Sequence, residues 1–282
     1  MIISFTLLKI LCGTIVVGSV SSTVGCFLLL QKKSLLGDTL AHATLPGIAL
    51  VFLITLKKNI LFLLLGASAT SLISSLLIAW IAQKTTLKND AILGVVLSFM
   101  FGLGIMILSI IQKYPVAQQA GINTFLLGNA STLLLGDLYV IFALGLIVYA
   151  SLYFFWKEFL ILTFDREHAE NMQLSTNKIQ TVFTIVTILT ILIGLQTVGI
   201  VLMSALLIAP AAAAQQWTNK ISSMILLSAG LSIFATVTGS LISFHIPQTP
   251  TGPAIVIIIT MIAFASIAYK ALFVDCKIWK RS

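Results

Sequence analysis

The feature that most constrains this sequence is a succession of apolar stretches, each about long enough to cross a bilayer as a helix. A spanning helix needs roughly 20 apolar residues. Such stretches occur at 5–30, 38–56, 60–82, 90–111, 137–156, 178–195, 197–214, 220–244 and 253–273. Only 9% of the 282 residues are charged, whereas soluble domains carry about 25%. The sequence therefore predicts an all-α integral membrane protein of about nine transmembrane helices, or eight, forming a single transmembrane domain over 1–282.

The positions of the basic residues predict how the spans are oriented. The first stretch has no basic segment before it and is followed by Lys32 and Lys33, so we interpret it as a span entering from outside rather than as a signal peptide. With the N-terminus outside and the C-terminus in the cytoplasm, most of the 16 basic residues fall in cytoplasmic segments, the exceptions being Lys9, Lys57, Lys58 and Lys113. The segment 119–136 is expected to form a short outer or re-entrant helix.

Four of the predicted spans carry a small residue at every fourth position, which gives each helix one smooth face. The sets are Thr14, Gly18, Ser22 and Cys26; Gly66, Thr70 and Ser74; Gly94, Ser98 and Gly102; and Ser228, Ser232, Thr236 and Ser240. Small residues let helix backbones approach closely in lipid, where no hydrophobic force drives helices together. We therefore expect these faces to be helix-packing surfaces rather than the lining of a pore.

One carboxylate stands out, because an acidic side chain inside the membrane is costly and marks a functional site. Seven of the 8 acidic residues have ordinary positions in polar segments or at the start of a span, where Asp90 and Asp137 would cap the helix. The remaining one, Asp38, precedes His42 by four residues. Both side chains therefore lie on one helix face, about 6 Å apart along the axis, where a carboxylate and an imidazole can share a divalent cation.

Pro46 and Gly47 follow this pair by one turn. Proline has no N–H, and its ring clashes with the carbonyl four residues earlier, which belongs to His42. We therefore expect a kink that frees this carbonyl, with Gly47 permitting close approach of another backbone. The alternative is that Asp38 caps the second span and His42 is a hydrogen-bonded core histidine. The other two histidines, His168 and His245, fall in a polar segment and a proline-rich outer loop.

The chain carries no motif for catalysis or nucleotide binding. It contains no Gly-Lys dipeptide, and hence no Walker A phosphate loop. HExxH, GxSxG and clustered membrane carboxylates are also absent, and the three cysteines form no CxxC pair. The sequence therefore predicts a protein that is not an enzyme and holds no permanent cofactor.

Several segments together resemble the permease subunits of ABC-type manganese, zinc and iron importers. The most specific is 37–49, which reads Gly-Asp-Thr-Leu-Ala-His-Ala-Thr-Leu-Pro-Gly-Ile-Ala. Further similar segments lie at 90–96, 125–129, 164–169, 197–202, 204–212 and 251–256. One departure follows the segment 164–169, where the family's usual Gly-Leu reads Gln173-Leu174. The resemblance extends from about residue 5 to residue 270.

This resemblance implies a permease with a type II-like ABC importer fold, which moves Mn, Zn or Fe inward across a prokaryotic plasma (inner) membrane. It implies a two-fold permease dimer, cytosolic ATPase subunits and an extracytoplasmic metal-binding protein. Asp38 and His42 would belong to the metal path. The loop 157–178 would couple the permease to the ATPase, with a short helix over 164–174 that carries the contact residues Phe164, Asp165, Arg166, Glu167, Ala169 and Met172.

Two other functions stay open at this point. An ABC permease for a larger metal chelate would not be expected to need an Asp–His pair. An ion-coupled secondary metal transporter would need no ATPase, but such proteins usually show inverted repeats with broken helices, and no repeat pairs Pro46 with Pro210. The sequence does not choose among the metals, because manganese, zinc and ferrous iron all accept carboxylate and imidazole ligands.

Overall fold

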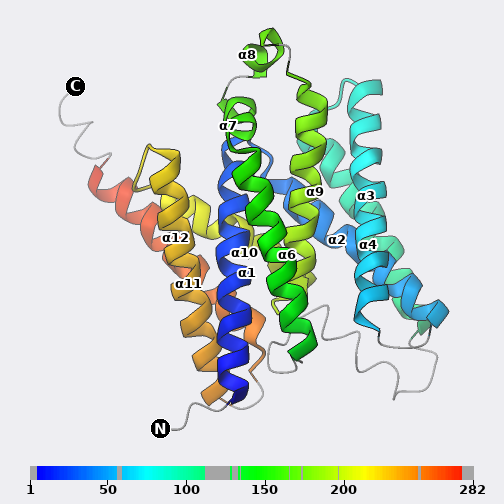
Figure 1. Cartoon of the computed structure of the whole chain (residues 1–282), viewed down its shortest axis with the longest axis vertical. Coiled ribbons are helices and arrows are strands. Elements are labelled where there is room, and N and C mark those ends of the chain that lie inside the picture. Colours follow the sequence, from blue (N-terminus) through cyan, green and yellow to red (C-terminus); the bar gives the residue numbers. More distant parts are fainter. Residues whose placement is uncertain are drawn as a thin grey trace.

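The computed structural model is a bundle of helices (Figure 1). It describes residues 5–55, 59–111, 128, 133, 135–164, 166–172, 174–195, 197–246 and 249–274, and these contain no strand. The helices are α1 (Phe5–Leu30), α2 (Ser34–Thr55), α3 (Ile60–Lys84), α4 (Asn89–Ile111), α6 (Leu135–Phe154), α7 (Trp156–Phe164), α8 (Arg166–Asn171), α9 (Thr176–Leu195), α10 (Ile200–Gln215), α11 (Ile221–His245), α12 (Thr251–Tyr269) and the π-helical turn η3 (Lys270–Val274). Most of the segment 119–136, expected to be a short outer or re-entrant helix, lies outside the described residues.

Among the described residues, eight helices are long and apolar enough to cross a membrane, namely α1, α2, α3, α4, α6, α9, α11 and α12. The ninth predicted span, 197–214, corresponds to α10, which has only 16 residues. At 1.5 Å per residue it is about 24 Å long, short of a hydrocarbon core of roughly 30 Å. The structure therefore favours the lower of the two expected counts, with α10 as a shorter helix inside the bundle.

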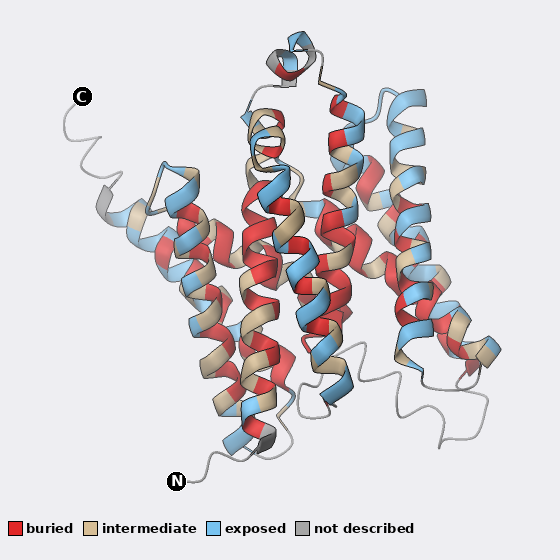
Figure 2. Cartoon of the chain, in the orientation of Figure 1, coloured by how far each residue is buried: buried red, intermediate tan, exposed pale blue. Residues whose placement is uncertain are grey.

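Burial divides the bundle into inner and outer helices (Figure 2). The inner helices α1, α2, α9 and α10 carry most of the buried side chains, while α3, α4, α6, α11 and α12 expose large apolar residues along one side. An exposed apolar face is what lipid contact requires of a spanning helix. The start of α1 and the pair α7 and α8 lie at opposite ends of the bundle (Figure 1).

The predicted small-residue faces of α1 and α11 pack against each other. Ser232 Oγ donates a hydrogen bond to the Gly18 carbonyl at 2.9 Å, and the hydroxyls of Thr14 and Ser240 lie 3.3 Å apart. Small side chains bring the two backbones close enough for these bonds, which stabilise helix pairs in lipid. The prediction of a packing face is confirmed for this pair.

A second close contact joins α2 to α3 and α4. A Cβ atom at Gly47 would overlap the carbonyl of Gly66, and one at Gly104 would overlap the side chain of Leu45. The α4 set behaves differently, because a Cβ atom at Gly94 or Gly102 would meet nothing within 4 Å. This third small-residue face is therefore not packed against the described part of its own chain.

The reversal between α9 and α10 is as tight as the sequence predicts. The amide of Val198 donates to the carbonyl of Gly194 at 2.9 Å, and Gly199 adopts a φ of 87°. Only glycine adopts this left-handed conformation without a steric penalty. The chain can therefore turn back at once and bury α10 beside α1 and α2.

Candidate metal site on α2

The position of Asp38 within α2 excludes the helix-cap interpretation. The sequence suggested a span starting at residue 38, but α2 begins at Ser34 and no acidic residue lies in its first turn. A carboxylate can cap a helix only when it reaches the free N–H groups at the helix start. Asp38 is already inside the helix, so it needs a different partner.

That partner is His42. The His42 Nε2 atom lies 3.4 Å from Asp38 Oδ1, and the exposed fractions of the two side chains are 14% and 30%. This is the i, i+4 pair that the sequence predicts, held on a helix face that stays partly open. The hydroxyl of Ser204 on α10 also interacts with the Asp38 carboxylate. Sequence reasoning missed Ser204 as a site residue, because only the fold brings α10 beside α2.

Among the described residues, the second nitrogen of the His42 ring has no hydrogen-bond partner. Its Nδ1 atom is buried and unpaired among the described residues, while the ring packs edge-on against Phe101 of α4, with ring centroids 5.0 Å apart. A buried unpaired polar atom is unusual, because leaving it unbonded costs free energy. Phe101 limits the directions in which the ring can turn, so the imidazole is held beside Asp38.

Pro46 and Gly47 act on the backbone around the pair. The helix α2 continues through Pro46 to Thr55 and is not broken there. Because Pro46 has no N–H, it cannot donate to the carbonyl of His42. Gly47 meets the backbone of Gly66, as its expected role in close approach requires. These contacts fix the part of α2 that follows the pair.

Chemically, the arrangement offers one carboxylate and one imidazole to a cation. No group of three or more His, Cys, Asp or Glu residues in the described ranges could hold a metal ion together. Transition metals take four to six ligands, so one chain supplies too few. The pair alone therefore does not complete such a ligand shell.

The remaining titratable residues do not gather at this site. Asp90 and Asp137 lie in the first turns of α4 and α6, as predicted. His245, expected in an outer loop, is instead the last residue of α11, where it is exposed and its Nδ1 lies 2.8 Å from the Leu241 carbonyl of the same helix. The side chain of His168 lies outside the described residues.

The predicted coupling segment lies at the end of the bundle opposite the start of α1 (Figure 1). It contains the end of α7, and α8 over Arg166–Asn171, so a short helix forms within 164–174 as expected. Phe164, Glu167 and Met172 are exposed and Ala169 is buried. Asp165 and the side chain of Arg166 lie outside the described residues.

An aromatic cluster anchors this segment to the bundle. Phe159 of α7 is fully buried, and its ring lies 5.3 Å from that of Phe183 on α9 and 6.3 Å from that of Phe27 on α1. Trp156 adds a further edge contact to Phe27 at 5.7 Å. Edge-to-face pairs of this kind favour one relative orientation of the rings, so α7 has a defined position on α1 and α9.

Comparison with known proteins shows the family of this chain. Residues 4–270 match the ABC 3 transport family. The chain is 38% identical to the zinc transport system membrane protein TroC of Treponema pallidum, over 93% of this chain and 88% of that protein. It is 35% identical to the manganese transport system membrane protein MntC of Bacillus subtilis, over 90% of this chain and 58% of that protein.

A solved structure shows the same fold. PsaBC from Streptococcus pneumoniae, determined in complex with Fab, superposes with a TM-score of 0.82 at 30% identity, covering 97% of this chain and 95% of the other. The eight apolar helices and this structural match define a membrane permease. The chain belongs to the ABC 3 transport family.

Proposed function

We propose that this chain is the permease of an ATP-driven importer of a divalent transition metal, either Mn, Zn or Fe, and that Asp38 and His42 lie on the metal path. The observation that carries the proposal is the pair itself, 3.4 Å apart on a spanning helix. The partial exposure of both side chains, 14% for His42 and 30% for Asp38, supports it, because a cation can then reach the carboxylate and the imidazole. The names of the relatives support a metal as cargo.

The ligand count supports a two-fold dimer. Two copies would contribute two carboxylates and two imidazoles around one axis, which is enough for a four-coordinate metal. The uncovered face of α4, with Gly94, Ser98 and Gly102, offers a place for the second copy. Phe101, which touches His42, is exposed on the same helix. A copy packed there would lie next to both sites.

The end of the bundle with α7 and α8 would face the cytoplasm and the ATPase subunits. Phe164, Glu167 and Met172 are exposed in a chain whose outer surface is otherwise mostly apolar, and exposed charged residues there cannot face lipid. The opposite end would then receive the cation from an extracytoplasmic binding protein. This orientation agrees with the excess of basic residues expected on the cytoplasmic side.

Metal uptake in cells that lack this chain and regain it as wild type or variant tests the proposal. We expect Asp38→Asn and His42→Ala each to lower initial uptake of the transported metal by about tenfold or more. The matched controls Asp90→Asn and His245→Ala change the same residue types outside the site and should stay near wild type. Normal uptake in both site variants, with normal assembly, would place the metal path elsewhere.

The same assay identifies the cargo. Uptake of free Mn, Zn and Fe is measured separately, and then with the metal presented as a preformed chelate. Uptake of the chelate but not of the free ions would contradict the proposal.

A second experiment tests coupling to the ATPase with the double variant Glu167→Gln and Met172→Ala. ATP hydrolysis by the assembled complex should persist in this variant while metal uptake is lost. Glu158→Gln, on α7, is the control for the change of charge.

A further inference from the structure

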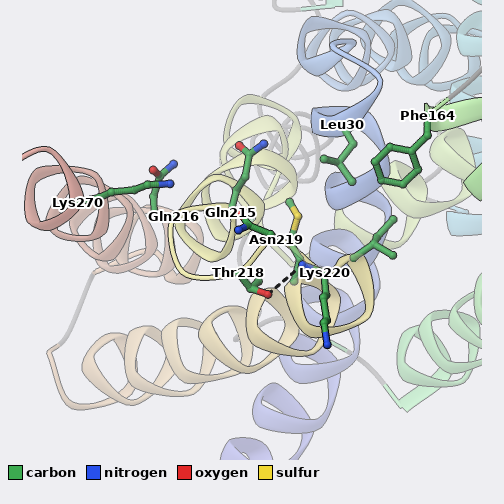
Figure 3. Close-up of a pocket in the computed structure, with 10 residues that line it drawn as sticks. Leu30, Phe164, Gln215, Gln216, Thr218, Asn219, Lys220 and Lys270 are labelled. Atoms are coloured by element: carbon green, nitrogen blue, oxygen red, sulfur yellow. Dashed lines mark hydrogen bonds between the residues drawn. The ribbon is translucent and has the colours of Figure 1, made fainter. Parts of the chain in front are cut away.

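A cavity of about 380 Å³ opens at the α7–α8 end of the bundle, away from the Asp38–His42 pair. It is bounded by Leu30 and Phe164, by the connection between α10 and α11, and by Lys270 after α12 (Figure 3). Its lining combines two lysines, Lys220 and Lys270, with neutral amides, among them Gln216 and Asn219, and with apolar side chains.

Among the described residues, the lining of this cavity carries positive charge without a carboxylate. No acidic side chain lines it within the described part of the chain, and the contact between Asp38 and His42 involves neither lysine. In Figure 3, Lys270 extends toward Gln216 on one side of the α10–α11 connection, and Lys220 lies on the other. Lys220 also precedes α11, whose start has no side-chain cap. Free N–H groups at a helix start favour a phosphate oxygen.

A pair of aromatic rings next in sequence to residues of the cavity lining is typical of a position at the membrane surface. Trp217 and Tyr269 stack with ring centroids 5.2 Å apart and an interplanar angle of 18°, and both are about half exposed. Tryptophan and tyrosine concentrate at the headgroup level of bilayers, where an apolar ring and a polar edge are both satisfied. On the membrane side of the two lysines, Leu226 of α11 and Phe264 of α12 are exposed and would contact acyl chains.

We propose that this cavity binds the headgroup of an anionic phospholipid from the leaflet at the α7–α8 end. The two lysines would attract the anionic headgroup from either side of the α10–α11 connection, the amides between them would donate to its phosphate, and the apolar residues of α11 and α12 would contact the chains. Basic pockets between transmembrane helices bind lipid headgroups in this manner. Because Phe164 also lines the cavity, the bound lipid would touch the segment that carries α8.

Native mass spectrometry of the purified full-length chain tests the proposal. Phosphatidylglycerol and phosphatidylcholine with identical acyl chains are added in equal amounts, and the bound lipids are counted. We expect a preference for phosphatidylglycerol that falls roughly thirtyfold in Lys220→Gln with Lys270→Gln, about 1 kcal/mol for each lysine. The control, Lys84→Gln with Lys88→Gln, removes two exposed lysines outside the cavity and should keep the preference.

Three outcomes would overturn the lipid site. They are an unchanged preference in the cavity variant, an equal loss in the control, and displacement of phosphatidylglycerol by inorganic phosphate, which would show a free anion site. Co-purification of the ATPase is measured on the same variants. Loss of the ATPase with an intact lipid preference would show that the cavity is a protein interface and would also overturn the proposal.

Discussion

The imidazole Nε2 of His42 lies 3.4 Å from the carboxylate Oδ1 of Asp38, one helical turn earlier on α2. The two side chains come from one rigid helix, so their relation does not depend on a loop. A pair held in this way should act as a single functional unit. The first prediction concerns this coupling.

The double variant Asp38→Asn with His42→Ala should lose no more uptake than either single variant, to within about twofold. Residues that act as one unit show strongly non-additive losses, whereas independent sites add in free energy. Initial rates of metal uptake are measured for the wild type, the two single variants and the double variant. This double-mutant cycle gives the coupling free energy between the two residues. Losses that multiply would show that the two residues act separately.

Gly47→Ala should destabilise the protein by about 1–3 kcal/mol, the usual range for overpacking, and should lower uptake although both ligands remain. The added Cβ atom would overlap the Gly66 carbonyl and push α2 away from α3. Thermal unfolding in detergent measures the effect. Gly230→Ala adds a Cβ atom that meets nothing within 4 Å and should be neutral or stabilising. Equal stability of the two variants would contradict the close contact.

Phe159→Ala should destabilise the position of α7 by about 3 kcal/mol or more, because it removes a fully buried ring from contact with Phe27 and Phe183. If this segment couples to the ATPase, uptake should fall while ATP hydrolysis continues. The control Phe154→Ala removes an exposed ring at the end of α6, next to the start of α7. Uptake that tracks hydrolysis in the Phe159 variant would argue against a coupling role.

Cysteine labelling of intact cells tests the orientation. In a background with Cys12, Cys26 and Cys276 replaced by serine, Asn59→Cys at the start of α3 should react with a membrane-impermeant thiol reagent, and Glu167→Cys on α8 should not. Permeabilised cells should label at both positions. Labelling of Glu167→Cys from outside would invert the topology that the basic residues predict.

The local pattern of the sequence was sufficient for most of the helices and for the pair on α2. Apolar stretches of membrane length mark α1, α3 and α4 within a few residues of the observed ends. The four-residue spacing of Asp38 and His42 places them on one face of any helix. The start of α2 could not be placed as well, because Ser34 and the residues after it are too mixed in polarity to mark a boundary.

The small-residue faces show the limit of such patterns. The same spacing occurs on α1, α11 and α4, yet the faces of α1 and α11 pair through Ser232 and Gly18, while Gly102 of α4 faces open space. A helix pattern shows which side can approach a neighbour. It does not show which neighbour is present, because this depends on the other helices.

The sequence by itself determined that this is a membrane-spanning helical protein with a carboxylate and an imidazole on one helix face, because hydrophobic length and helical periodicity are local properties. The tertiary structure decided that α10 is short and buried, that Ser204 and Phe101 complete the surroundings of the pair, and that Lys220 and Lys270 border one cavity. These contacts join residues far apart in the chain. They follow from the packing of whole helices, which no local pattern of residues specifies.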